Sequence, residues 1–275
     1  MEIMKNSNFN FMGKRKFAMG FSALLIVVSI VSLFSRGLNL GLDFSGGSLI
    51  EVGYQQSVDT ESVRNTLTKA GYAEAIVTHF GSAKEVLIKV APREGLTNAD
   101  LSSDILRALR IADSSVDMRR VEFVGPQIGE ELREDGGMAM LFAIIGILIY
   151  VALRFEYRFA LGSVAALLHD VLITIGVFSV LQLEFDLTVL AAVLAVIGYS
   201  LNDTIVVFDR IRENFLRARK ASSEEVINKS LNQTLSRTLM TSVTTMLVLL
   251  ALFFLGGALI HGFATALIAG VVIGT

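Results

Sequence analysis

The residues best suited to chemistry are charged side chains in or beside long apolar runs of the sequence. Asp203 lies within the run 187–208, and Arg237 directly precedes the run 238–255. A charge at the centre of a membrane-spanning helix costs about 2.5–3.5 kcal/mol on insertion scales, so an ionisable residue there is a functional candidate. Both residues lie near the same ends of their helices, and we expect them to share a depth and to pair.

An aspartate and an arginine in this arrangement are suited to proton carriage. Burial opposes the charged form of a carboxyl group, whereas a nearby guanidinium favours it. Movement of Arg237 toward or away from Asp203 would therefore switch the carboxyl group between releasing and binding a proton. The alternative is a structural ion pair that only holds two helices together.

Polar neighbours extend this candidate site. Tyr199 and Ser200 precede Asp203 by four and three residues, which places them on its side of a helix and predicts hydrogen bonds to it. Thr241 follows Arg237 by four residues and predicts a polar stripe that faces inward or lines a wet cavity.

A second ionisable pair, His169 and Asp170, lies midway along the run 159–181. We favour a hydrogen-bond pair between helices, with a functional role as the alternative. An intramembrane metal-dependent hydrolase is the weakest interpretation, because no further His or Asp ligands lie at suitable positions. The sequence also contains no cysteine, which excludes disulfides, thiolate nucleophiles and Cys-based metal sites. We therefore predict no catalytic residue, metal or cofactor.

The composition indicates the elements that must hold these residues. Of 275 residues, 53% are hydrophobic and 18% charged, against about 25% charged in soluble domains, and the mean hydropathy is +0.61. Since a span takes about 20 apolar residues, the chain is predicted to be a polytopic α-helical membrane protein. Six runs are candidate spans, at 17–34, 137–153, 159–181, 187–208, 238–255 and 258–275. The last run ends without a polar tail, and we expect the sixth span to be truncated.

The first span, taken as 17–35, is expected to be an uncleaved anchor. Three basic residues precede it, as in a signal peptide, but no A-x-A cleavage pattern follows it. The overall net charge of −2 gives no basic surplus for nucleic acid.

The charges between the runs alternate in sign. The leader 1–16 and the connector 209–237 each carry a net charge of +3, and the link 154–158 carries +1. In contrast, the long segment 36–135 carries −5 and the short segment 182–186 carries −2. The positive-inside rule therefore places the leader, link and connector in the cytoplasm. The segment 36–135 is expected outside, and residues 136–275 are expected to hold spans two to six.

The segment 36–135 has the pattern of a small α+β domain. Its order of predicted elements is βαββαβ, which is typical of a ferredoxin-like fold. Gly46–Gly47 is interpreted as a tight entry into the first strand, because no Lys-Ser/Thr follows as in a phosphate loop. His79 is interpreted as a packed or solvated residue, because it lacks a second ligand at metal spacing. The strands are expected at 47–52, 75–80, 85–90 and 118–124, and the helices at 59–70 and from the capping box Thr97–Asp100.

Several longer motifs resemble a known family. They occur in the right order and together look like SecF, the smaller membrane subunit of the bacterial SecD–SecF accessory translocase. The motifs are GLDFSGG (41–47), EFVGPQIG (122–129), Phe155-Glu156, GYSLNDTIVVFDRIREN (198–214) and TLSRTL (234–239). The resemblance extends from about Phe17 to the last residue, but the family's usual cytoplasmic tail is missing.

This resemblance implies a function and a set of partners. Such proteins belong to the resistance–nodulation–division superfamily and pair with a SecD-like subunit in a twelve-helix unit. The unit associates with the SecYEG channel in the bacterial inner membrane and uses the proton motive force in late steps of preprotein export. The resemblance implies that Asp203 carries the proton, that Arg237 is its basic partner and that Asn202 is an accessory polar group. The expected partners are thus SecD, SecYEG, the preprotein, protons and membrane lipids, without nucleic acid.

Two other functions remain open at this point. A proton-driven exporter of small molecules or lipids in the same superfamily would need room for a binding pocket, and one outside domain of about 100 residues offers little. A scaffold that only stabilises a partner complex would tolerate charge-neutral variants at both Asp203 and Arg237.

Overall fold

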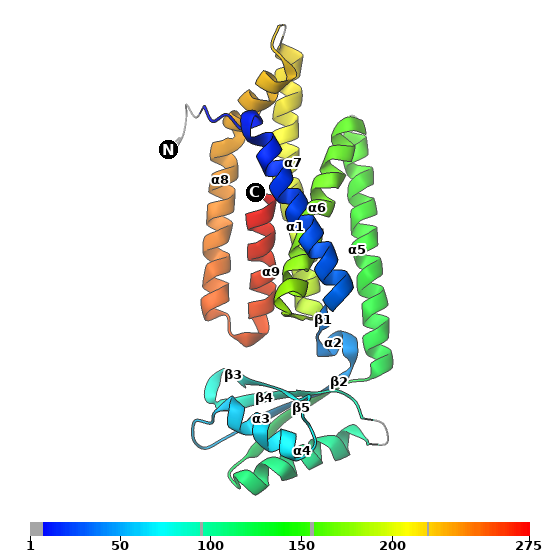
Figure 1. Cartoon of the computed structure of the whole chain (residues 1–275), viewed down its shortest axis with the longest axis vertical. Coiled ribbons are helices and arrows are strands. Elements are labelled where there is room, and N and C mark those ends of the chain that lie inside the picture. Colours follow the sequence, from blue (N-terminus) through cyan, green and yellow to red (C-terminus); the bar gives the residue numbers. More distant parts are fainter. Residues whose placement is uncertain (1–7, 94–95, 155–156, 219) are drawn as a thin grey trace.

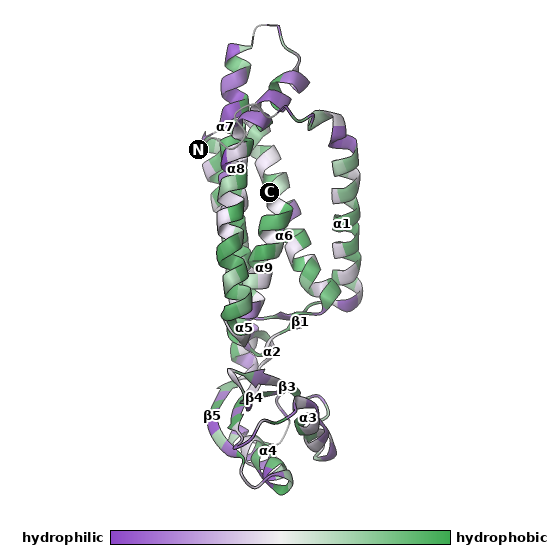
Figure 2. Cartoon of the chain, turned by 90° about the vertical axis from the view of Figure 1, so that its left-hand side faces the viewer, coloured by the Kyte–Doolittle hydropathy of each residue, from purple (hydrophilic) through white to green (hydrophobic). Residues whose placement is uncertain are grey.

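The computed structural model describes residues 8–93, 96–154, 157–218 and 220–275. It contains a bundle of long helices and a small sheet domain at one end of the bundle (Figure 1). Hydrophobic residues extend along the bundle, and hydrophilic residues gather at the ends of its two longest helices, far from the sheet (Figure 2). The long helices are α1 (Arg15–Arg36), α5 (Pro126–Arg154), α6 (Tyr157–Leu181), α7 (Leu187–Arg217), α8 (Ser223–Leu255) and α9 (Ala258–Gly274).

The described helices define a polytopic membrane protein. Five of them, α1, α5, α6, α7 and α8, are long and apolar enough to cross a membrane. The sixth expected span corresponds to α9, an apolar helix of 17 residues that is shorter than the length required for a spanning candidate.

Several helices extend beyond the apolar runs that predict them. Helix α5 begins at Pro126, whereas its apolar run begins at Gly137. Helix α7 continues to Arg217, and α8 begins at Ser223 after a capping box made by Ser222 and Glu225. The segment expected as a connector, 209–237, is therefore helical up to Arg217 and again from Ser223. Hydropathy detects the part of a helix that faces lipid, whereas caps determine where the helix ends.

The sheet domain has four antiparallel strands in the order β3-β4-β2-β5. Its elements are β2 (Gly47–Gly53), α3 (Thr60–Lys69), β3 (Ile76–Phe80), β4 (Ser82–Val90), α4 (Asn98–Ala112) and β5 (Asp117–Val124). The predicted capping box at the start of α4 is confirmed, because the Thr97 side chain accepts from the Asp100 N–H and the Asp100 side chain accepts from the Thr97 N–H.

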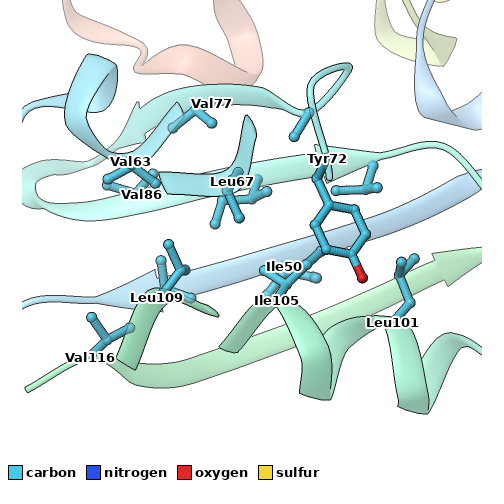
Figure 3. Packing of buried hydrophobic residues seen from close by; sticks show 14 residues of the cluster. Ile50, Val63, Leu67, Tyr72, Val77, Val86, Leu101, Ile105, Leu109 and Val116 are labelled. Carbon is cyan, nitrogen blue, oxygen red and sulfur yellow. The ribbon is translucent and has the colours of Figure 1, made fainter. Parts of the chain in front are cut away.

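One face of this sheet is covered by the two helices (Figure 3). Ile50 on β2 packs with Leu67 of α3 and Ile105 of α4, and all three side chains are fully buried. Because side chains alternate along a strand, the neighbours Leu49 and Glu51 point to the opposite face. That second face lies toward the bundle, where Leu49 and Glu51 line a small cavity together with Leu259 of α9.

A short neck connects the sheet to the bundle. It consists of β1 (Asn39–Leu40) and α2 (Leu42–Ser45), and β1 pairs in parallel with β6 (Glu184–Phe185) between α6 and α7. Gly46 and Gly47 follow, with φ angles of +71° and +137°, which L side chains rarely adopt. A Cβ at Gly47 would lie 2.5 Å from the carbonyl oxygen of Val90. The tight entry predicted for this pair of glycines is confirmed.

Helix α1 packs on α6 through small residues. Ser32 and Ser179 share a hydrogen bond of 2.8 Å between their hydroxyl oxygens. A Cβ at Gly176 would collide with the Ser29 side chain, so the missing side chain permits the close approach.

The segment before α1 is held against α8 by two asparagines one helical turn apart. Asn228 accepts from the Phe11 N–H at 2.8 Å and donates to the Phe9 carbonyl at 3.1 Å. Asn232 accepts from the Phe9 N–H at 2.8 Å. These contacts connect the start of α1 to α8, a helix that is distant in the sequence.

Candidate functional site

Asp203 lies in the interior of the bundle, on the middle part of α7. Its side chain is buried, with 6% of the residue exposed. Oδ1 lies 3.4 Å from the Asn202 amide nitrogen, which donates to it. Oδ2 is buried and has no hydrogen-bond partner among the described residues. The carboxyl group therefore has one oxygen available to bind a proton.

Arg237 lies on α8, the helix beside Asp203, but the two side chains do not form the expected direct pair. Among the described residues, no ion pair or hydrogen bond joins Arg237 to Asp203, although the charge of Arg237 acts on the carboxyl group. The side chain of Arg237 is exposed. The structure thus brings the two charges near one another and leaves the arginine without the contact that the sequence predicted.

The hydroxyl groups near these charges bond elsewhere. Ser200 donates to Oδ2 of Asp170 at 2.6 Å, and Tyr199 donates to Ser242 on α8 at 3.0 Å. The expectation that both would bond to Asp203 is therefore wrong. Helical spacing correctly places them on one side of α7, but neighbouring helices supply the acceptors.

Thr241 does not form an inward polar stripe. Its hydroxyl donates to the backbone carbonyls of Arg237 and Thr238, at 3.1 and 2.9 Å. Thr244, one turn further, likewise bonds to its own helix and is exposed. Such bonds satisfy the hydroxyl groups within α8 and leave them without a role toward Asp203.

His169 and Asp170 form a hydrogen-bonded unit that extends to α7. Nδ1 of His169 lies 2.8 Å from Oδ1 of Asp170, whose other oxygen accepts from Ser200. Asp170 is buried, and Nε2 of His169 is buried without a partner among the described residues. A hydrogen bond between helices is present at Asp170, from α6 to α7, whereas the bond between His169 and Asp170 lies within α6.

Two further residues belong to this region and were missed in the sequence. A Cβ at Gly274, near the end of α9, would lie 2.9 Å from Oδ2 of Asp170. Thr275 shares a hydrogen bond of 2.9 Å with Ser242. A glycine and a threonine at the end of an apolar run carry no sequence signal of such a role, although small residues do permit close helix packing in membranes.

Two other features of the sequence bear on the site, a possible metal cluster and the motif residues Phe155 and Glu156. Among the described residues, no group of three His, Cys, Asp or Glu side chains is arranged to hold a metal. Phe155 and Glu156, which belong to the recognised motifs, lie outside the described residues.

Buried carboxyl groups on helices long enough to cross a membrane indicate the class of protein. The chain is a polytopic membrane protein with ionisable groups inside its transmembrane part. Residues 104–275 match the family "Protein export membrane protein SecD/SecF, C-terminal", and residues 31–58 match the "SecD/SecF GG Motif". The second match contains the glycine pair of the neck.

Sequence identity to named relatives shows the family to which the chain belongs. The chain is 51% identical to the protein translocase subunit SecF of Vibrio alginolyticus, over 100% of this chain and 88% of that protein. It is 44% identical to SecF of Escherichia coli O157:H7, over 97% of this chain and 83% of that protein. The chain belongs to the SecF family of bacterial protein translocase subunits.

Solved structures support the same assignment. SecDF of Thermus thermophilus, described as a translocon-associated membrane protein, is 40% identical with a TM-score of 0.87 and matches 100% of this chain. SecDF in a super-membrane-facing form is also 40% identical, with a TM-score of 0.75 over 99% of this chain. Since the identities are equal, the arrangement of this chain is closer to the first structure. The chain spans 37% of the length of each SecDF chain.

Proposed function

We propose that this chain is a non-enzymatic accessory subunit that uses the proton motive force to assist late steps of preprotein export across the bacterial inner membrane. The observation that carries the proposal is the buried Asp203 carboxyl group, which has an oxygen without a partner and lies within the electrostatic reach of Arg237. A structural ion pair would instead be closed by direct contact.

The geometry supports a cycle of proton binding and release at Asp203. When Arg237 approaches, its charge favours the ionised carboxylate and expels the proton. When Arg237 withdraws, the buried carboxyl group is left without a counter-charge and binds a proton at Oδ2. Each proton that crosses the membrane supplies about 2.3 kcal/mol per 100 mV. Asn202 would orient Oδ1 through its amide and leave Oδ2 as the proton-binding atom.

The proposed topology has six spans and a cytoplasmic N-terminus. The alternation of net charge between segments supports it, with positive segments at the bundle end that is distant from the sheet. In this topology α9 is the sixth span. The sheet domain lies outside the membrane and has a ferredoxin-like fold, a proposal supported by its βαββαβ order and by the strand order β3-β4-β2-β5.

The proposed partners are a SecD-like subunit, the SecYEG channel, the exported preprotein and the surrounding lipids. The similarity to SecDF supports the first of these, because this chain matches only part of that longer chain. The exposed apolar side chains along α1, α5 and α8 provide surfaces for a second membrane subunit or for lipid.

The test is export in inverted membrane vesicles that contain the chain with its SecD-like partner. We expect Asp203→Asn to abolish the stimulation of export by a proton gradient and to leave insertion and partner binding intact. Asp209→Asn is the matched control, since Asp209 lies six residues further along α7 and is half exposed. Proton-stimulated export at the normal rate in Asp203→Asn would disprove the proposal.

A further inference from the structure

We propose that His169, held by Asp170, is a second proton-binding site in the bundle, with Nε2 as the atom that binds the proton. This inference rests on the proposed function, because it extends the proton path from Asp203 toward the sheet domain. The site is formed by α6 and α7, and its ligand is a proton that enters from the side of the sheet.

The hydrogen bonds around Asp170 determine which atom of His169 is available. A carboxylate only accepts hydrogen bonds, and Asp170 has a donor at each oxygen: His169 at Oδ1 and Ser200 at Oδ2. Nδ1 of the imidazole therefore carries the hydrogen. In a neutral ring Nε2 then holds a lone pair, and this atom is buried without a partner among the described residues. A buried polar atom without a partner is costly, so Nε2 is the atom of the ring at which the hydrogen bonding of the unit is incomplete.

The charge of the unit favours the same event. A neutral His169 beside an ionised Asp170 leaves one negative charge in a region where charges are expensive. A proton on Nε2 converts the unit into an imidazolium–carboxylate pair with no net charge. The proton passes from a hydronium ion to Nε2, so an O–H bond of the donor breaks as the N–H bond forms and a water molecule is left.

Other titratable groups near the unit are few. Asp203 on α7 follows Ser200 by three residues. The charged residues of α1 are Arg15, Lys16 and Arg36, at its two ends, and the titratable residue of α9 is His261, at the end opposite Gly274. Helix α5 has no charged residue between Gly137 and Leu153. Asp170 is thus the counter-charge of His169, and Asp203 is the nearest carboxyl group along α7.

The position of the unit fits a step before Asp203. Helix α7 starts beside the sheet domain, so Ser200 lies about 4.5 Å closer to that domain than Asp203 does. Onward transfer balances if the Nδ1 proton moves to Asp170 and a proton then leaves Asp170 for Asp203. Because Ser200 bonds to Asp170 and not to Asp203, its hydroxyl must turn toward Asp203 before it can take part in this transfer.

The backbone around the unit limits what else it can bind. Gly274 of α9 faces Oδ2 of Asp170, where even a methyl group would lie at 2.9 Å. Thr174 satisfies the backbone carbonyl of Asp170 with a hydrogen bond of 2.7 Å. The close packing leaves room for a proton and excludes a larger cation beside Oδ2.

The direct test is nitrogen NMR of histidine-labelled chain, in complex with its SecD-like partner in lipid nanodiscs. His79→Gln and His261→Gln remove the other two histidines of the chain, so that the imidazole signals come from His169. We expect an Nδ1–H ring at high pH and protonation of Nε2 as the pH falls. In Asp170→Asn the imidazolium has no counter-charge, and we expect Nε2 to remain unprotonated over the same range. An Nε2 that never changes its protonation while the protein is folded would overturn the proposal.

Export in vesicles separates this inference from the proposed function. A positioned proton-transfer group contributes about 10²-fold or more, so we expect His169→Gln to slow proton-driven export by at least about 10²-fold. Thr174→Val, which removes a buried hydroxyl one turn away, is the matched control and should retain export. If Asp203→Asn abolishes proton-driven export while His169→Gln does not, the second site is wrong and the proposed function stands. If His169 titrates but Asp203→Asn exports normally, the proposed function fails instead.

Discussion

Lys89 on β4 and Glu184 on β6 form an ion pair that joins the sheet domain to the segment between α6 and α7. Both side chains are partly buried. Two hydrogen bonds strengthen the same junction: the Gly41 N–H donates to the Phe185 carbonyl at 2.8 Å, and the Leu187 N–H donates to Asp43 at 3.0 Å. Since α7 begins at Leu187 and carries Asp203, the sheet domain and its neck are attached to the start of the helix that holds the candidate site.

Lys89→Met should loosen this attachment. We expect a broader distribution of distances between spin labels on the sheet domain and at the start of α7, because one of the junction contacts is lost. The pair itself contributes up to about 1 kcal/mol if it behaves as an exposed pair, with more where water is excluded. Lys84→Met is the matched control, on the exposed part of the same strand. An unchanged distance distribution in Lys89→Met would contradict a role for the pair.

Gly47→Ala should destabilise the chain more than Gly71→Ala. Both glycines have positive φ angles, +137° and +90°, and such strain costs about 1–3 kcal/mol each for an L residue. A Cβ at Gly71 meets open space, whereas a Cβ at Gly47 would lie 2.5 Å from the Val90 carbonyl oxygen. Only Gly47→Ala must therefore also separate β2 from β4. Calorimetric unfolding of the two variants checks this order. Equal losses of unfolding free energy would show that the contact at Val90 is unimportant.

Gly176→Leu should separate α1 from α6. The absence of cysteine makes a direct measurement simple, because Ser32→Cys with Ser179→Cys introduces the only two thiols. The hydroxyl oxygens of these serines are 2.8 Å apart, so we expect a disulfide to form readily in this background. With Gly176→Leu added, the side chain collides with Ser29 and the crosslink should be lost. Gly146→Leu serves as the control, since a Cβ at Gly146 meets nothing within 4 Å.

Tyr54 should ionise at a higher pH than an ordinary tyrosine. Burial, and secondly the charge of Asp113, raise the pKa of Tyr54 from 10.0 to about 12. Two hydrogen bonds from Ser115 lower the pKa of Asp113, so that this carboxyl group is charged throughout the range. We expect Asp113→Asn to lower the pKa of Tyr54 only partly, because burial is the larger cause. Ultraviolet titration of the phenolate, as a difference from Tyr54→Phe, measures this shift.

The same shift predicts how stability depends on pH. Between pH 10 and about 12 the unfolded chain loses the Tyr54 proton while the folded chain keeps it. The contribution of Tyr54 to stability is therefore complete below pH 10 and is lost as the pH rises toward 12. Tyr54→Phe should remove this part of the alkaline loss, and an identical pH dependence in the variant would rule out the assignment.

Much of the fold could be predicted because its signals are local. Apolar runs identified the long helices, alternating side chains identified the strands, and Thr97 with Asp100 identified the start of α4. Helix ends were less accurate: α5 begins at Pro126, before the apolar residues that reveal it. The polar first turns of such a helix contain no apolar run and therefore leave no hydropathy signal.

The sequence by itself determined that Asp203 and Asp170 are buried in apolar helices, because a charged residue inside such a run has no other place to lie. Only the tertiary structure decided what each of them contacts. Ser200 is on the correct side of α7 to reach Asp203, yet its hydroxyl bonds to Asp170 on α6. Arg237 is brought near Asp203 without touching it, and Gly274 is brought against Asp170. Spacing along a helix determines the direction of a side chain, whereas its partner depends on which helix packs against that side and at what height.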